Sequence, residues 1–264
     1  MPDQVKYANK LHGARILIIG GSSGIGYGLA EACLEFGATV IISSSNPTRI
    51  ASAISALQSA YPSAASRITG YACELANAAT LDAAIVSLFA AATSAGAEKL
   101  DHVVFTAGDA LMTKPLPEIT LDFVQQAGMV RFFAPLLIAR EAAAHLRPSY
   151  TSSYTITTGS VSQKPMPGWA VIGAYAGGHH TMARGLALDM RPVRVNAVSP
   201  GAVDTALWRM GEAEKKAMFE GMEKRMATGR VGRVEDVVET YLGVLRDENC
   251  TGSVVSTNGG VLIM

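Results

Sequence analysis

Glycines in the stretch IGGSSGIG at 19–26 have the spacing of a turn that could hold a phosphate. Gly20, Gly24 and Gly26 follow an apolar run and open a helical pattern, and a chain that turns so tightly from strand to helix needs residues without Cβ. The amides at the helix N-terminus would then face outward with a partial positive charge suited to phosphate. The spacing GxxxGxG is not the GxGxxG of the commoner dinucleotide turn, and a tight turn without a ligand is the alternative.

A second polar cluster follows the next apolar run, in the stretch IISSSNPTRI. An acidic residue at this position would hydrogen-bond the adenosine ribose 2′-OH of NAD(H) and repel a 2′-phosphate. The stretch has no acid and carries Ser44, Ser45, Asn46 and Arg49, whose donors favour NADP(H) over NAD(H). Ser45 and Asn46 could equally serve as caps of the helix that begins here.

Short apolar runs that alternate with longer helical patterns must position these turns. Runs that are apolar along their whole length are typical of strands buried on both faces, in a parallel sheet covered by helices. They lie at 15–20, 39–44, 67–72, 102–107, 153–158, 193–199 and 252–257. The alternation predicts an α/β fold, a Rossmann-type doubly wound parallel sheet of about seven strands, in a single domain over residues 1–264.

Helical patterns fill the intervals between these runs. They span 24–37, 46–61, 78–96, about 117–146, 169–190 and 234–246. The segment 203–228 lies outside the alternation, and we predict a helical lid there, because insertions at the carboxyl ends of strands are where α/β folds place ligand contacts. Met218, Met222 and Met226 recur every four residues, so they should form one stripe of a helix that faces either the core or a pocket.

Charge and cysteine content restrict the classes of partner. The 22 basic and 22 acidic residues balance, so we expect neither nucleic acid nor a membrane surface as a partner. Cys33, Cys73 and Cys250 are odd in number and far apart, which indicates reduced thiols rather than a disulfide framework or a metal site. The sequence shows no signal-peptide pattern and no apolar run of about 18 residues, so we expect a cytoplasmic protein that acts on small molecules.

Four motifs in order resemble those of the classical short-chain dehydrogenase/reductase family, and the resemblance runs along essentially the whole chain. The glycine turn resembles TGxxxGxG, FTAG at 105–108 resembles NNAG, NAVSPGAVDT at 196–205 contains the PG turn, and 251–260 resembles TGxxxxxxGG. The resemblance implies an NADP(H)-binding domain. The residues that it places around the cofactor are Gly20, Ser22, Ser23, Gly24, Ile25, Gly26, Ser44, Ser45, Asn46, Arg49, Glu74, Leu75, Ala107, Gly108, Pro200, Gly201, Val203 and Thr205.

The catalytic asparagine, serine, tyrosine and lysine of that family are the part that this sequence lacks. The family's tyrosine donates a proton to the substrate carbonyl oxygen, and the lysine lowers the pKa of that tyrosine. Aligned without a gap, the PG pair at 167–168 and the later stretch RGLALD place Ile172 at the tyrosine position and Ala176 at the lysine position. Gly159 then takes the serine position and Arg131 the asparagine position.

A second register is the alternative. Ser162, Tyr175 and His179 reproduce the family's spacing with histidine in place of lysine. This register needs three residues inserted before the tyrosine and three deleted within the following helix, which would turn the packing face of that helix. We prefer the ungapped register, in which Tyr175 is a packing or interface residue and His179 and His180 lie along a helix surface.

An apolar residue at the acid position restricts the chemistry. Reduction of an ordinary ketone creates an alkoxide that needs a proton, whereas hydride transfer to an iminium ion neutralises a cation and leaves an amine. Ile172 cannot donate a proton, so the sequence favours an activated acceptor or a reaction without hydride transfer. Arg131 could bind the cofactor or a substrate carbonyl oxygen, or form a salt bridge, and Trp169 could stack on a flat polycyclic substrate or simply pack.

Arginine for asparagine and the stretch PMPGW before the helix make the chain similar to a fungal subgroup of the family that contains reductase/Diels–Alderases of alkaloid biosynthesis. The resemblance implies Arg131 and Trp169 as catalytic residues beside a substrate pocket. We place Met166, Ile172, Trp208 and Met210 in that pocket. Members of the subgroup carry an aspartate where Met166 stands, so their aspartate-dependent step is not carried over.

Three functions follow, in order of preference. The first is an atypical NADPH-dependent oxidoreductase that reduces an iminium or conjugated group in a large apolar secondary metabolite and then guides an intramolecular Diels–Alder cyclisation. The second is a non-redox cyclase or isomerase that retains NADP(H) structurally, and the third is an NADP(H)-binding pseudoenzyme. The helices near 117–146 and 169–190 resemble those through which family members associate, which implies a homotetramer or homodimer.

Overall fold

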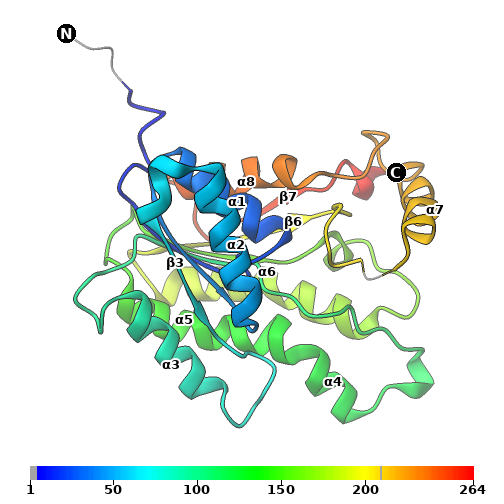
Figure 1. The fold of residues 1–264 in the computed structure, drawn as a ribbon. Helices are drawn as coiled ribbons and strands as arrows, with labels where there is room; N and C mark the ends of the chain where they lie inside the picture. Colours follow the sequence, from blue (N-terminus) through cyan, green and yellow to red (C-terminus); the bar gives the residue numbers. More distant parts are fainter. Residues whose placement is uncertain (1–4, 209) are drawn as a thin grey trace.

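Seven parallel strands form one sheet through the centre of the molecule in the computed structural model, which describes residues 5–208 and 210–264 (Figure 1). The strands are β1 (Arg15–Ile19), β2 (Thr39–Ser44), β3 (Ile68–Ala72), β4 (His102–Phe105), β5 (Ser153–Thr157), β6 (Arg194–Pro200) and β7 (Val254–Thr257). Each overlaps one of the seven apolar runs. Their order across the sheet is β3-β2-β1-β4-β5-β6-β7, and every neighbouring pair is parallel. The predicted doubly wound parallel sheet is confirmed.

Burial on both faces explains why the central strands are apolar along their length. Every residue of β4 and β6 is buried, whereas β3 and β7 at the two edges of the sheet include exposed positions. A strand that packs helices on both sides has no solvent face on which a polar side chain could lie. The central runs therefore show no alternation of apolar and polar residues.

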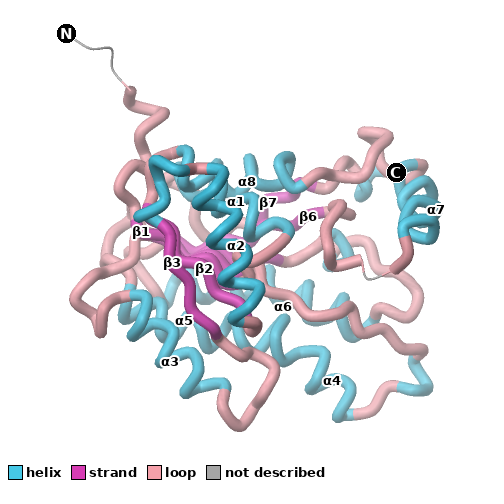
Figure 2. Tube along the Cα trace, viewed as in Figure 1, coloured by secondary structure: helices cyan, strands magenta, loops and turns pink. Residues whose placement is uncertain are grey.

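Helices cover both faces of the sheet, as Figures 1 and 2 show. One face packs against α1 (Gly24–Glu35), α2 (Pro47–Ala60) and α8 (Val234–Arg246), and the other against α3 (Leu81–Ala92), α5 (Ala134–His145) and α6 (Ala170–Asp189). Leu29, Leu57 and Leu242 contribute to the first core, and Phe89 and Ile138 to the second. The sheet is packed between these two cores, which fix the positions of the carboxyl ends of its strands.

The direction of winding reverses between β1 and β4. Strands β2 and β3 lie on one side of β1, and β4 to β7 lie on the other. Connections that leave β1 and β4 in opposite directions open a crevice at the carboxyl ends of these strands, where open α/β sheets bind ligands. Gly20 after β1 and Ala107 after β4 meet there, since a Cβ on Gly20 would lie 2.5 Å from the main-chain nitrogen of Ala107.

The long helix expected near 117–146 begins at α4 (Leu121–Gly128), whose N-cap is Thr120. It passes through a π-helical turn, Met129–Phe133, before it continues as α5. The sequence did not predict this turn. Single π-turns inside α-helices frequently occur at functional sites, and this one carries Arg131.

Within the described part of the segment 203–228, the chain forms the helix α7 (Glu212–Glu223), which lies near the C-terminus (Figure 1). Its Lys215 Nζ is 2.5 Å from Oδ1 of Asp204, so an ion pair ties the helix to the chain that leaves β6. Met226 lies beyond the end of α7. The prediction that Met218, Met222 and Met226 form one stripe of a helix is therefore wrong for Met226. Within the described ranges, no helix is both long and apolar enough to cross a membrane.

Candidate active site

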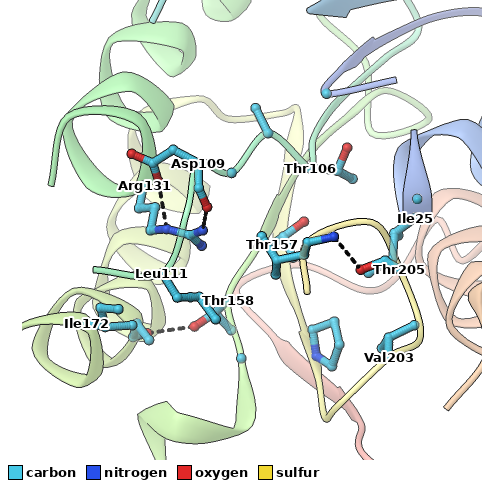
Figure 3. Close-up of a pocket in the computed structure, with 18 of the residues that line it drawn as sticks. Ile25, Thr106, Asp109, Leu111, Arg131, Thr157, Thr158, Ile172, Val203 and Thr205 are labelled. Atoms are coloured by element: carbon cyan, nitrogen blue, oxygen red, sulfur yellow. Dashed lines mark hydrogen bonds and ion pairs between the residues drawn. The ribbon is translucent and has the colours of Figure 1, made fainter. Parts of the chain in front are cut away.

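A cavity of about 860 Å³ extends along the carboxyl ends of the strands, and Figure 3 shows part of its lining. Its walls include every residue that the sequence places around the cofactor except Asn46. They also include Arg131, Trp169, Met166, Ile172 and Trp208, whereas Met210 is not among the lining residues. The volume is near the upper end of the range for small-molecule and cofactor sites, about 300–1,000 Å³.

The glycine turn after β1 fits a dinucleotide phosphate. A Cβ on Gly26 would overlap the main-chain oxygen of Gly20 and Oγ1 of Thr106, so a larger residue cannot approach so closely. Ser23, the N-cap of α1, makes no side-chain capping bond, and the first turn of α1 has no acidic residue. The amides at this helix end are therefore free for an anion.

The end of β2 presents donors to the same cavity. Ser44, Ser45 and Arg49 line it, and Arg49 is exposed. Oδ1 of Asn46 accepts a hydrogen bond from the main-chain nitrogen of Arg49 at 3.0 Å, so Asn46 caps α2. Of the two roles that the sequence left open for Asn46, the structure shows the cap.

The chain that leaves β6 closes the other end of the cavity. Val203 and Thr205 line it, and the Nε1 of Trp208 donates to the main-chain oxygen of Val203 at 2.8 Å. A Cβ on Gly24 would lie 3.4 Å from the side chain of Thr205, so this segment reaches back to the glycine turn. Residues that follow β1 and β6 thus meet at this end of the cavity.

Arg131 forms an ion pair with Asp109, a partner that the sequence reasoning missed (Figure 3). Nε of Arg131 lies 2.9 Å from Oδ1 of Asp109, and the guanidinium also donates to the main-chain oxygen of Asp109. Burial lowers the pKa of Arg131, and the Asp109 charge opposes that shift. Arg131 is therefore both salt-bridged and part of the cavity wall, and an acid directly after FTAG was the available signal.

Ile172 and Ala176 stand one turn apart on the buried face of α6, and both line the cavity (Figure 3 labels Ile172). The main-chain oxygen of Ala176 accepts a hydrogen bond from Oγ1 of Thr158 at 2.7 Å, which fixes this part of α6 against the end of β5. Gly159 lines the cavity beside it. An apolar wall at these three positions is what the ungapped register predicts.

Of the three residues of the second register, Tyr175 and His179 both pack on Phe132 and line the cavity, whereas Ser162 is not among the lining residues. The Tyr175 hydroxyl donates to the main-chain oxygen of Val124 at 2.9 Å, and the Tyr175 ring packs on Phe132 with centroids 4.9 Å apart. Oγ of Ser162 is instead 2.9 Å from Nε2 of His180. Tyr175 borders the cavity, but its hydroxyl is already used, and burial raises its pKa.

The sequence analysis predicted that His179 lies along a helix surface. The structure shows that His179 lies on the buried face of α6. Ile172, Ala176, His179 and Ala183 are the buried residues of this helix, and their spacing of three and four residues places them on one side. His179 is 5% exposed and lines the cavity, whereas the neighbouring His180 is only partly buried. The expectation failed because two adjacent histidines face different directions on a helix.

Apolar side chains line the part of the cavity between α6 and the segment 203–228. Trp169, the N-cap of α6, and Trp208 both line it, and Trp208 packs edge-on to Phe219 with ring centroids 6.1 Å apart. Met222 and Met226 also line it. Met222 and Met226 therefore face the cavity, where their flexible thioethers can adapt to a bulky apolar ligand, whereas Met218 is not among the lining residues.

The class of the protein follows from the fold, this site and comparison with known proteins. Residues 7–264 match the family model of the SDR-like Rossmann domain. The chain therefore belongs to the short-chain dehydrogenase/reductase family, whose fold binds a nicotinamide cofactor.

Two fungal relatives are similar over nearly their full length. The short-chain dehydrogenase/reductase fsr5 of Gibberella fujikuroi is 46% identical over 263 residues, covering 98% of both chains. The short-chain dehydrogenase/reductase malC of Malbranchea aurantiaca is 40% identical over 257 residues, covering 96% of both. The solved structure of MalC reductase/Diels–Alderase from Malbranchea aurantiaca superposes with a TM-score of 0.91 at 38% identity, covering 98% of this chain and 100% of that one.

A bacterial structure adds information on the cofactor. A short-chain dehydrogenase from Burkholderia cenocepacia in complex with NADP has a TM-score of 0.82 at 25% identity, covering 96% of this chain and 99% of that one.

Proposed function

We propose that the protein is an NADPH-dependent reductase of an activated group, an iminium ion or a conjugated group, in a large apolar secondary metabolite of a fungus. The same cavity then guides an intramolecular Diels–Alder cyclisation of the reduced product. The observation that carries the proposal is Ile172, which has no proton to give and forms the cavity wall at the acid position of the ungapped register. Similarity to MalC reductase/Diels–Alderase supports it.

NADPH, when bound, supplies a hydride. The chain would hold its phosphates at the start of α1 and its 2′-phosphate at Ser44, Ser45 and Arg49, all of which line the cavity. Glu74 and Leu75 would border the adenine, and Pro200, Gly201, Val203 and Thr205 the nicotinamide. The exposed, permanently charged Arg49 supports NADP(H) over NAD(H).

Hydride transfer to an iminium carbon neutralises a positive charge and forms a neutral amine, so no proton has to be delivered at that step. A ketone would need one, and loss of a positioned general acid typically costs about 10²–10⁴-fold in rate. The apolar wall at Ile172 and Ala176 is therefore compatible with the first reaction and unsuited to the second.

Arg131 would bind an oxygen or nitrogen acceptor of the substrate with the guanidinium hydrogens that Asp109 leaves free. Because the Asp109 carboxylate lies 2.9 Å from Nε, the pair is close to neutral as a unit. A cationic acceptor can then enter without facing an uncompensated positive charge. Trp169, Trp208 and Met222 would hold the flat apolar body of the substrate and exclude water.

The test is a comparison of acceptors with purified protein. A cyclic iminium salt such as a dihydroisoquinolinium and a ketone such as cyclohexanone are each incubated with NADPH deuterated at C4. We expect deuterium in the amine product and a rate for the iminium at least about 10²-fold above that for the ketone. If NADPH is not consumed with either acceptor, the reductase part of the proposal is wrong.

A non-redox cyclase that retains NADP(H) structurally is the second candidate, because an apolar wall at Ile172 suits a cyclisation that moves no hydride. The two differ in cofactor dependence. Equal product formation from a reactive diene substrate before and after removal of NADP(H) would assign the second function.

A further inference from the structure

Two walls of the apolar part of the cavity, between α6 and the segment 203–228, are joined by one turn of the chain. The first wall is the loop 160–169, which leads from β5 into α6, and the second wall is the end of the segment 203–228. The turn that joins them is 258–264, which follows β7 and contains the glycine pair of the motif at 251–260. The function proposed above gives this turn no role.

Lys164 attaches the turn to the first wall. Its Nζ donates to the main-chain oxygens of Val261 at 2.8 Å and of Met264 at 2.5 Å. The main-chain nitrogen of Lys164 donates to the main-chain oxygen of Ser160 at 2.9 Å, so the lysine is itself fixed to the short helical turn after β5. Lys164 and Val261 both line the cavity, so this attachment lies at the border of the ligand space.

The second wall is attached to the same turn by close main-chain contacts. The main-chain nitrogen of Thr228 donates to the main-chain oxygen of Gly259 at 3.1 Å. A Cβ on Gly259 would lie 2.8 Å from Cε of Met226, and a Cβ on Gly260 would lie 2.6 Å from Cβ of Ala227. Both glycines also have positive φ values, 61° and 75°. Only residues without Cβ therefore let the second wall approach the turn this closely.

Both walls carry side chains that would contact the substrate. The first wall continues from Lys164 to Met166 and Trp169, and the second wall includes Met222 and Met226. All of these residues line the cavity. Because one turn holds both walls, the spacing between their side chains depends on that turn. Dispersion contacts lose much of their energy over a gap of about 0.5–1 Å, so this spacing decides which width of ligand is bound well.

We propose that Lys164 is a positioning residue that selects substrates by size. Its ammonium holds the turn 258–264, and through that turn the end of the segment 203–228, at the spacing that fits a flat polycyclic ligand. The inference rests on the proposed function in that the apolar part of the cavity binds the substrate. Without the ammonium, the second wall would retreat from a polycyclic ligand, whereas a small ligand that touches one wall would bind as before.

The first experiment follows the two walls without ligand or turnover. Amide hydrogen exchange is measured by mass spectrometry on the full chain, for peptides that cover 222–232 and 256–264. Lys164→Met keeps the length of the side chain and loses the ammonium, and Lys164→Arg keeps a charged donor. Lys99→Met is the matched control, because Lys99 Nζ also donates to a main-chain oxygen, that of Ala144 at 2.6 Å, and neither residue is among those lining the cavity.

We expect exchange of both peptides to be at least about threefold faster in Lys164→Met, with recovery in Lys164→Arg and no change in Lys99→Met. If 256–264 exchanges faster and 222–232 does not, Lys164 holds only the turn, and the proposal is wrong. No change in either peptide also overturns it.

The second experiment measures substrate selection. KM is measured at saturating NADPH for a tricyclic iminium, a dihydro-β-carbolinium, and for a monocyclic one, a pyrrolinium. In Lys164→Met, KM for the tricyclic acceptor should rise about threefold to tenfold, which corresponds to lost contact over roughly 25–55 Å² of apolar surface. KM for the monocyclic acceptor and the NADPH dissociation constant should stay within about twofold. A loss of folded protein would instead lower the apparent kcat for both acceptors alike, and equal KM changes for both would contradict size selection.

A variant on the other side of the turn covers the case in which Lys164→Met does not fold. Gly260→Ala places a Cβ 2.6 Å from Cβ of Ala227, so it should displace the second wall and raise the same ratio of KM values. Because both substitutions act on one connection, the double variant should change that ratio no more than the larger single effect. Full additivity would contradict a single connection. The exchange measurement needs no acceptor, so failure of this proposal and failure of the reductase proposal are distinguishable.

Discussion

Arg131 and Asp109 form an ion pair that joins two elements far apart in the sequence: Nε of Arg131 lies 2.9 Å from Oδ1 of Asp109. Arg131 comes from the π-turn between α4 and α5, and Asp109 follows β4. The side chains are 21% and 33% exposed, so the pair is only partly screened by solvent. It fixes a planar, charged donor in the cavity wall.

Arg131→Ala should lower kcat/KM for an activated acceptor by about 10²-fold, the typical effect of removing one preorganised donor from a site. Arg131→Lys keeps the charge but loses the planar fork, so it should recover only part of the loss. Steady-state kinetics with NADPH and a cyclic iminium measure both. If kcat/KM of Arg131→Ala changes by less than twofold, Arg131 has only a structural role in the salt bridge.

Asp109→Asn tests whether the carboxylate compensates the guanidinium. The variant leaves Arg131 with an uncompensated positive charge, so KM for a cationic acceptor should rise about tenfold and fall again as salt is added. A neutral conjugated acceptor of similar size is the control, and its KM should change much less. Equal effects on both acceptors would show that Asp109 acts by orienting Arg131 rather than by its charge.

Arg49→Ala should weaken NADPH binding by about tenfold and leave NADH binding unchanged, because only NADPH carries the 2′-phosphate. Arg49→Lys retains a charge and should lose less. Calorimetric titration of both cofactors gives the ratio directly. Asn46→Ala is a useful comparison, since Asn46 caps α2 and its loss should lower stability without changing the NADPH-to-NADH ratio.

The fold was predictable from the sequence because seven runs are apolar along their whole length, and only burial on two faces gives that pattern. The tight turn after β1 was predictable because Gly20 and Gly26 have no substitutes where main chains approach this closely. Contacts between elements were not predictable. Asp109 lies 22 residues from Arg131, and only a π-turn that no sequence pattern marked brings the two together.

The burial of the His179 side chain also could not be predicted from the sequence. Two adjacent histidines on a weakly amphipathic helix give no signal of which one is buried. Met210 and Asn46 are not among the residues that line the cavity, and Asn46 instead caps α2.

Tyr175→Phe distinguishes the two registers of the missing catalytic residues. In the ungapped register Tyr175 packs, so kcat should stay within about twofold while stability falls by about 1 kcal/mol, from loss of the bond to Val124. A rate loss of 10²-fold or more would make Tyr175 the acid. The complementary variant, Ile172→Tyr with Ala176→Lys, should gain NADPH-dependent reduction of cyclohexanone.

The stability of the ligand-free protein should fall with acid, partly through His179. Burial lowers the pKa of His179 from 6.5 in the unfolded chain to about 4 in the folded one. Between these values the unfolded chain binds more protons, so the contribution of this group is fully present above pH 6.5 and is lost as pH falls toward 4. His102, with a pKa of about 3 for the same reason, acts in the same direction.

His179→Leu removes the first contribution and keeps the second. Between pH 7 and pH 5 the variant should lose less unfolding free energy than the unaltered protein, by an amount on the order of 1–2 kcal/mol. Urea unfolding at the two pH values measures the difference, with His180→Leu as the control for a partly exposed histidine. If the free energy of unfolding falls equally in His179→Leu and in the unaltered protein, His179 is already protonated or solvated in the folded state. That result would contradict the burial of His179 as a neutral ring.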